Sequence, residues 1–188
     1  DTVVSGIGQG FVQVTPLPLA TYTSRIATGR SVEPHLVRAI NGEIAPKVDP
    51  QHWPTLPTDP TYLNAIREGM FAVVNEQHGT APKGRLSIPG VEMAGKTGSA
   101  QVRRVSRAMR ESGHFNSATL PWEFRPHALF ICFAPYADPR YAVSVVIEHG
   151  NAGADVAAPL ARDIMTETLR RDPVNHKTAP GQTVADAN

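Results

Sequence analysis

The sequence has almost no cysteine, almost no net charge and no long apolar run. Its single cysteine, Cys132, excludes an intrachain disulfide and a metal site built from several cysteines. The formal net charge of +1 provides no overall field for nucleic acid or for an anionic membrane. No apolar run approaches the roughly 20 residues that cross a bilayer, and no signal peptide is recognisable. The length of 188 residues is enough for one domain with a sizeable buried core.

Capping and breaking residues indicate where helices begin and end. They predict one helix between Pro16 and Gly29, preceded by Thr15 as its N-cap, and a second between Pro60 and Gly79. Asp155 is expected to cap a last helix, because an apolar face with helical spacing follows it. The connection over 46–60 contains too many prolines to hold regular structure.

Strand signals are concentrated in the second half of the chain. Residues 127–134 and 141–148 are rich in β-branched and aromatic side chains, and a short turn-rich link joins them. Both are apolar on nearly every residue, so helices should cover both faces of the sheet. With a strand over 94–102, the pattern predicts an α+β fold in which an antiparallel sheet is packed between helices. Residues 172–188 are expected to form a disordered tail.

The most informative segment is 94–102, which contains Lys96, Thr97, Gly98 and Ser99 in succession. Alternate side chains of a strand share a face, so the two hydroxyls should lie on one face and the lysine on the other. Two hydroxyls on one face can bind one terminal carboxylate. The ammonium can raise the local potential and help to order a proton-relaying hydroxyl, and glycine lets a ligand backbone approach closely. A chance match of a short string remains the alternative.

Other conspicuous residues are interpreted structurally. The link over 102–126 is long compared with hairpin loops of about 2–5 residues. Trp122 and Phe124 in this link are interpreted as hydrophobic anchors and not as site residues. His149 should end a strand, and no pair of histidines has metal-ligand spacing. Cys132 should be a buried, inert thiol. Four clustered arginines are interpreted as a solvated basic loop: Arg103, Arg104, Arg107 and Arg110.

Further motifs occur in order along roughly residues 1–171. They are Gly6-Ile7-Gly8-Gln9-Gly10, Val14-Thr15-Pro16-Leu17, Pro34-His35-Leu36-Val37, Ala94 to Val102, Trp122-Glu123-Phe124, His127-Ala128-Leu129-Phe130, Glu148-His149-Gly150 and Ala157-Ala158-Pro159. In this order they resemble class B penicillin-binding proteins, most closely the penicillin-binding protein 2 group of the cell-elongation machinery. The resemblance assigns Pro34-His35-Leu36-Val37 to a strand and Glu148-His149-Gly150 to the last strand.

The resemblance implies the C-terminal portion of a transpeptidase domain of the penicillin-binding protein and β-lactamase fold. The implied activity is that of a peptidoglycan D,D-transpeptidase, which crosslinks stem peptides through a serine acyl-enzyme and is inhibited by β-lactams. By the same resemblance Lys96 and Ser99 are the catalytic residues, whereas Thr97, Gly98 and Ser99 bind the substrate. The family usually has threonine where Ser99 stands, and the hydroxyl is kept. No cofactor and no metal are implied.

The implied partners are peptidoglycan stem peptides, β-lactams and the missing N-terminal part of the same protein. A SEDS-type glycosyltransferase and proteins of the elongation complex are further implied partners, and nucleic acid is not. The implied location is the periplasmic face of the bacterial inner membrane, with anchoring by an N-terminal segment that is not in this chain.

Two signatures of the family are absent from the sequence. No serine is followed by Lys three residues later or by Asn two residues later. The nucleophile, its partner lysine and the second-motif serine are therefore expected N-terminal to Asp1, and this chain alone should not be acylated. The alternatives are a non-catalytic pseudoenzyme or β-lactam-sensing domain, and a β-lactamase, which shares the Lys-Thr-Gly motif but not the glycine-rich and Thr-Pro-Leu motifs.

Overall fold

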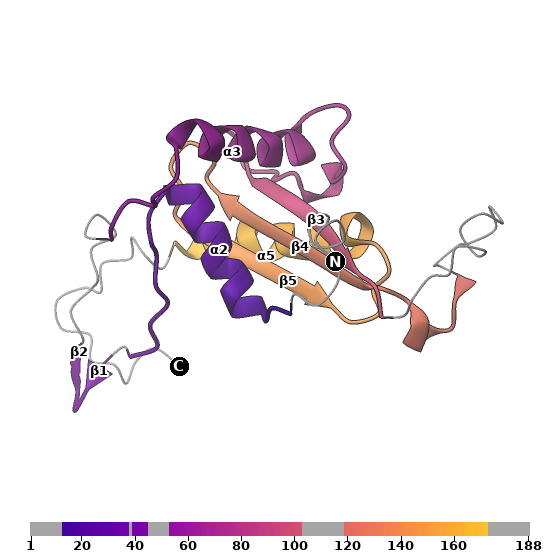
Figure 1. Cartoon of the computed structure of the whole chain (residues 1–188), viewed down its shortest axis with the longest axis horizontal. Helices are drawn as coiled ribbons and strands as arrows, with labels where there is room; N and C mark the ends of the chain where they lie inside the picture. The colour runs from indigo at the N-terminus through magenta and orange to yellow at the C-terminus, as the bar shows by residue number, and fades with distance from the viewer. Residues whose placement is uncertain (1–12, 38, 45–52, 103–118, 173–188) are drawn as a thin grey trace.

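A three-stranded antiparallel sheet in the order β3-β4-β5 forms the centre of the molecule (Figure 1). The structure is a computed structural model that describes residues 13–37, 39–44, 53–102 and 119–172. The strands β3, β4 and β5 span Ala94–Ala100, His127–Ala134 and Tyr141–Ile147. The three strands predicted from the residue pattern over 94–102, 127–134 and 141–148 are therefore confirmed, and β4 has the predicted bounds. The strand β5 ends before Glu148-His149-Gly150, which were expected within it and instead belong to the turn that follows.

Two helices precede the sheet in the chain, as predicted. The helix α2 spans Pro16–Thr28 and ends at Gly29, whose φ of 68° is the left-handed conformation that glycine adopts without strain. Thr15 precedes it in extended conformation but makes no side-chain cap bond. The helix α3 spans Pro60–Asn75, and its N-cap Asp59 accepts a hydrogen bond from the Thr61 amide at 2.8 Å.

The chain turns back after α3 in a tighter way than the sequence indicated. The helix was expected to continue to Gly79 but ends at Asn75. The amide of Ala81 donates to the Val73 carbonyl at 2.9 Å, which brings the chain back over the helix end. A Cβ on Gly79 would lie 2.4 Å from that carbonyl oxygen, so glycine is required by the turn and not by the helix end itself.

The last helix begins differently from the prediction. A five-residue π-helix, η5 (Gly153–Ala157), precedes the α-helix α5 (Ala158–Arg171). Asp155 lies inside η5, and its carboxylate accepts from Lys83 Nζ at 2.7 Å, so the expected capping role is wrong. Asp172 ends α5 in the left-handed conformation and pairs with Arg140 at 2.7 Å. The folded part thus includes Asp172, and the rest of the predicted tail lies outside the described residues.

Helices cover the two faces of the sheet, as the apolar strands predicted. Phe130 and Cys132 of β4 are completely buried in one cluster with Met165 of α5. Phe133 is buried in a second cluster with Ile26 of α2. In Figure 1, α2 crosses in front of the sheet and α5 lies behind it. We call these two sides of the sheet the α2 face and the α5 face.

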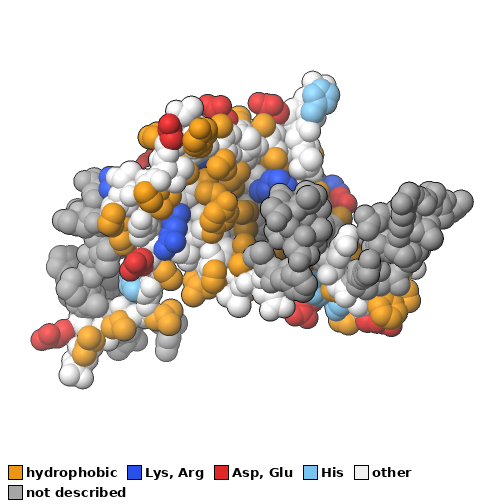
Figure 2. Space-filling view, in the orientation of Figure 1, with side chains coloured by type: hydrophobic (Ala, Val, Ile, Leu, Met, Phe, Trp, Pro, Cys, Tyr) orange, Lys and Arg blue, Asp and Glu red, His pale blue; other side chains and the backbone are white. Residues whose placement is uncertain are grey.

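Apolar side chains also remain at the surface. On the side shown in Figure 2 they gather over α2 and α3. Exposed examples are Leu17 and Tyr22 of α2, and Tyr62 and Ile66 of α3. The helices α2 and α3 are therefore apolar on more than the side that packs on the sheet.

A small hairpin lies away from the sheet (Figure 1). Its strands β1 (Ala39–Ile40) and β2 (Glu43–Ile44) pair around Asn41 and Gly42, both with positive φ. Residues 34–37, which the resemblance assigned to a strand, have no regular structure. The glycine-rich motif at 6–10, residues 46–52 of the proline-rich connection and the four clustered arginines lie outside the described residues.

Candidate functional site

The Lys-Thr-Gly-Ser motif lies on β3, which is an edge strand of the sheet that the described residues form. Strand β3 pairs with β4 from Ala94, opposite Phe133, to Ala100, opposite His127. Within the described ranges no strand pairs with the other edge of β3. Backbone N–H and C=O groups on such an edge are available to an extended peptide, which can add to the sheet as a further strand.

The register divides the motif between the two faces of the sheet. Lys96 is opposite Ile131, on the α2 face, whereas Thr97 is opposite Phe130, on the α5 face. Ser99 lies two positions after Thr97 in the strand, and alternate side chains of a strand share a face. The two hydroxyl side chains therefore share a face, as the sequence predicted. Thr97 is half-buried and Ser99 is exposed. This placement lets both hydroxyls reach one carboxylate at the strand edge.

Lys96 carries an exposed charge on the face of β3 opposite to that of the hydroxyls. Its Nζ donates to the carbonyl oxygen of Thr97 at 2.7 Å. Among the described residues no carboxylate forms an ion pair with Lys96. The ammonium therefore adds positive potential around this part of β3, and no described carboxylate neutralises it through an ion pair.

Two glycine contacts fix the position of this strand. A Cβ on Gly95 would lie 2.4 Å from Phe130 Cζ, so the absence of a side chain lets the strand rest on that buried ring. A Cβ on Gly153 of η5 would lie 2.3 Å from the Leu129 oxygen and 2.7 Å from the Gly98 oxygen. The start of η5 thus packs directly on the backbone of β3 and β4 within the motif. Sequence reasoning missed Gly153, although the glycine-rich 150–153 segment after β5 signalled a close approach.

Three rings meet at the far end of β3, and we call Trp122, His127 and His149 the ring cluster. The centroids of Trp122 and His149 are 4.4 Å apart, and those of His127 and His149 are 4.8 Å apart. Trp122 begins a short 3-10 helix, η4 (Trp122–Phe124), and remains 60% exposed. A hydrophobic anchor buries its ring, so the anchor interpretation is wrong for Trp122. His149 follows β5 with a φ of 55° rather than ending the strand.

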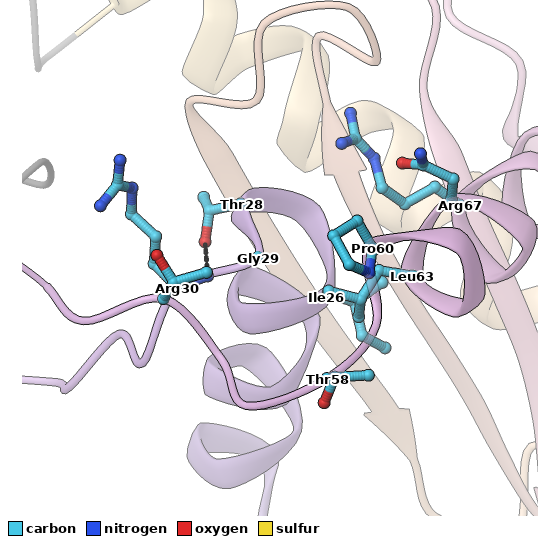
Figure 3. A pocket seen from close by; sticks show the side chains of 10 residues that line it. Ile26, Thr28, Gly29, Arg30, Thr58, Pro60, Leu63 and Arg67 are labelled. Atoms are coloured by element: carbon cyan, nitrogen blue, oxygen red, sulfur yellow. Dashed lines mark hydrogen bonds between the residues drawn. The ribbon is translucent and has the colours of Figure 1, made fainter.

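A separate hollow of about 240 Å³ lies where the end of α2 meets the start of α3 (Figure 3). Arg30 and Arg67 extend from opposite sides of it (Figure 3). Arg30 Nη1 donates to the Trp53 carbonyl at 3.0 Å and Arg67 Nη2 to the Tyr136 carbonyl at 3.4 Å. Both arginines therefore already hold backbone segments together. The described residues that line the hollow include none from β3, so it is distinct from the candidate site.

Cys132 is buried between β3 and β5, as expected. Burial raises the pKa of its thiol to about 12, which keeps it protonated and unreactive near neutral pH.

In the parts of the chain that are described, no three His, Cys, Asp or Glu side chains come together as metal ligands. None of the helices in those parts is long and apolar enough to cross a membrane.

The layered α+β fold and the Lys-Thr-Gly-Ser edge strand together define a transpeptidase domain of the penicillin-binding type. Residues 1–166 match the family described as the penicillin binding protein transpeptidase domain, and the chain belongs to this family. The resemblance stated from the sequence is confirmed. Solved structures of this family resemble the chain as well and share its fold.

Similar proteins have names that fit this assignment. Peptidoglycan D,D-transpeptidase MrdA of Haemophilus influenzae is 38% identical over 174 residues, which are 91% of this chain and 26% of that protein. Pseudomonas aeruginosa PBP2 in complex with WCK 5153 has a TM-score of 0.67 and 35% identity, over 89% of this chain and 33% of that one. The complex of PBP2 and MreC from Helicobacter pylori has a TM-score of 0.67 and 30% identity. This match covers 93% of this chain and 28% of that one. The chain thus spans about a quarter to a third of these relatives.

Proposed function

We propose that this chain supplies one wall of the active site of a peptidoglycan D,D-transpeptidase. The observation that carries the proposal is the placement of Lys96, Thr97 and Ser99 on an open-edged strand, within residues that match the transpeptidase domain. The name of the Haemophilus relative supports the same activity. Because the chain spans only part of such proteins, the remaining wall comes from residues outside it.

The substrate is a stem peptide that ends in D-Ala-D-Ala. Its terminal carboxylate accepts hydrogen bonds from the Thr97 and Ser99 hydroxyls, and the Lys96 ammonium adds electrostatic attraction. Its backbone lies along the open edge of β3, where Gly98 presents no side chain to the ligand. Of the atoms around Gly98, the nearest to an added Cβ is Leu129 Cβ at 3.3 Å, within the sheet and not at its edge.

The reaction proceeds through a serine ester. A serine hydroxyl attacks the carbonyl of the penultimate D-Ala, the ester bond forms, and the terminal D-Ala leaves with the proton on its amine. The amine of a second stem peptide then displaces the serine and forms the crosslink. The Ser99 N–H donates to the oxyanion of each tetrahedral intermediate, a contribution of about 3 kcal/mol to the barrier. Lys96 belongs to the proton-relay and electrostatic group.

The nucleophilic serine is not part of this chain. No serine of the sequence lies in a Ser-x-x-Lys or Ser-x-Asn motif, which are the family signatures for the nucleophile and the second serine. The protein acts at the periplasmic face of the bacterial inner membrane, where its stem-peptide substrates are. β-Lactams occupy the same carboxylate-binding residues as inhibitors. The expected partners are proteins of the elongation complex and a SEDS-type glycosyltransferase; PBP2 of Helicobacter pylori forms a complex with MreC, which supports a protein partner of this kind.

Covalent labelling by a fluorescent penicillin tests this function. The full-length protein should be labelled, and Lys96→Ala should lower the labelling rate by at least tenfold because the proton relay and the positive potential are lost. The isolated 188-residue chain should stay unlabelled. Labelling of the isolated chain, or none of the full-length protein, would refute the proposal.

A further inference from the structure

The two residues that precede β3 are held by hydrogen bonds from other parts of the chain. Pairing of β3 with β4 begins at Ala94. Just before it, the carbonyl oxygen of Glu92 accepts from the Tyr136 amide at 2.8 Å, and the carbonyl oxygen of Met93 accepts from Asn75 Nδ2 at 2.9 Å. Met93 is completely buried, so water cannot replace a donor at its carbonyl oxygen. The Asn75 side chain therefore satisfies a buried acceptor at the entry of the strand.

The side-chain amide of Asn75 has a fixed orientation. Asn75 is the last residue of α3, which lies beside β3 in Figure 1. Its Nδ2 donates to the Phe71 carbonyl oxygen at 3.0 Å as well as to Met93. Because both carbonyl oxygens can only accept, the two amide hydrogens are both used. The main-chain carbonyl of Asn75 accepts from Arg85 Nη2 at 2.7 Å, so the helix end that carries the amide is also tied down.

One face of α3 supports both bonds at the strand entry. Arg67, Phe71 and Asn75 are spaced by four residues and therefore share a face of the helix. Arg67 Nη2 donates to the Tyr136 carbonyl at 3.4 Å, and the Phe71 and Tyr136 ring centroids are 4.8 Å apart. Tyr136 is the residue whose amide binds Glu92. The helix thus reaches the strand entry through Tyr136 and, by the shortest route, through Asn75.

The strand entry lies close to the residues to which we assign the chemistry. Met93 is three positions before Lys96. Within the described ranges β4 pairs with one edge of β3, and no strand holds the other edge. Between the two residues, Gly95 rests on the buried Phe130 ring without a side chain of its own. A shift of the Met93 carbonyl would therefore be passed along a short length of backbone to Lys96.

We propose that Asn75 is a positioning residue for the transpeptidase reaction. It does not touch the substrate. Through the Met93 carbonyl it sets where β3 begins, and so where the Lys96 ammonium lies relative to the nucleophilic serine outside this chain. The role requires a hydrogen-bond donor at residue 75, which glutamine keeps and which leucine and an ionised aspartate lack. This inference rests on the proposed transpeptidase function.

The test measures acylation of the full-length protein by a fluorescent penicillin over a range of concentrations. The concentration dependence separates the maximal acylation rate from the half-saturating concentration. Asn75→Leu and Asn75→Asp should lower the maximal rate about 10- to 100-fold and change the half-saturating concentration less, because placement and not binding is lost. Asn75→Gln should recover a large part of the rate. The matched control is Asn64→Leu, an exposed position on the same helix, which should acylate normally.

A further variant separates positioning from general loosening of the helix end. Arg85→Met removes the bond to the Asn75 main-chain carbonyl and leaves the side-chain amide in place. Its unfolding midpoint should fall, whereas its maximal acylation rate should stay close to that of the unsubstituted protein.

Two results would overturn the inference. One is a normal maximal rate in folded Asn75→Leu or Asn75→Asp. The other is an equal loss of rate in Arg85→Met, which would mean that Asn75 only stabilises the helix end. If Asn75→Leu does not fold, the comparison of Asn75→Asp with Asn75→Gln decides, because both retain a polar side chain. If the unsubstituted full-length protein is not labelled, the proposed transpeptidase function fails, which is a distinct result.

Discussion

Replacement of Gly153 by alanine is the sharpest test of how the Lys-Thr-Gly-Ser strand is held. The added Cβ would lie 2.3 Å from the Leu129 oxygen and 2.7 Å from the Gly98 oxygen. Ordinary contacts between carbon and oxygen begin at about 3.3 Å, so η5 and the strands must separate by about 1 Å. The atoms in the way belong to the backbone of two paired strands, so no side-chain rotation can relieve the contact.

The displacement acts on the residues to which we assign the proposed chemistry. Ser99 follows Gly98, and its N–H is the proposed oxyanion donor. A misplacement of about 1 Å can cost about 100-fold in rate, and overpacking typically costs about 1–3 kcal/mol of stability. We therefore expect Gly153→Ala to lower the acylation rate of the full-length protein by a fluorescent penicillin by roughly 100-fold. Its unfolding midpoint should fall at the same time.

The control is Gly150→Ala in the same glycine-rich segment. Its Cβ would lie 2.9 Å from Ile147 Cγ2 and 3.0 Å from Ala128 Cβ, which are side-chain atoms of β5 and β4 and not backbone of β3. This variant should also lower the unfolding midpoint, but it should acylate at close to the unsubstituted rate. Stopped-flow acylation and thermal unfolding of both variants provide the comparison. Normal acylation of Gly153→Ala, or an equal loss in both variants, would show that the contact at Gly98 does not position the site.

Other changes probe the core, the thiol and a helix cap. Phe130→Ala should reduce the free energy of unfolding by about 3–5 kcal/mol, because the ring is completely buried beneath Gly95. A denaturant titration measures this loss, and a loss below about 1 kcal/mol would contradict the packing. Cys132, with a pKa of about 12, should not react with a thiol reagent at pH 8 until denaturant is added, and prompt reaction would contradict its burial. Asp59→Ala should lower the thermal midpoint at neutral pH, because the bonds from Thr61 that lower the Asp59 pKa are lost. The lowered pKa makes this stabilisation fully present above the ordinary value of 3.8 and lost as the pH falls below it, so the two proteins should converge in acid.

Local signals in the sequence were sufficient for the elements that sit in the middle of the fold. The strand 127–134 was predicted with the observed bounds because its apolar run is flanked by turn-forming residues. The alternation of Lys96 and Thr97 between faces followed from strand geometry alone. Both depend on neighbours along the chain, and tertiary contacts did not change them.

Features that depend on distant contacts were not predictable in this way. Asp155 has the side chain of a good N-cap, but Lys83 from another segment binds its carboxylate, and the chain enters α5 through a π-helix. Trp122 looked like an anchor because large apolar residues in loops usually are buried. Its contact with His149 depends on the positive φ of His149 after β5, which no local pattern indicated.

Close contacts hold the backbone of β3 in place, whereas the side chain of Lys96 is exposed. Gly95 lies against the buried Phe130 ring, and Gly98 lies against Gly153, so the positions of the strand backbone are set by contacts that leave no space for adjustment. The Lys96 ammonium, by contrast, is exposed and donates to the carbonyl of its own neighbour, Thr97. That bond can be exchanged without moving the strand. In the proposed reaction, an arriving serine or carboxylate can therefore accept the hydrogen bond from Lys96 while the proposed oxyanion donor, the Ser99 N–H, stays in place, as electrostatic preorganisation requires.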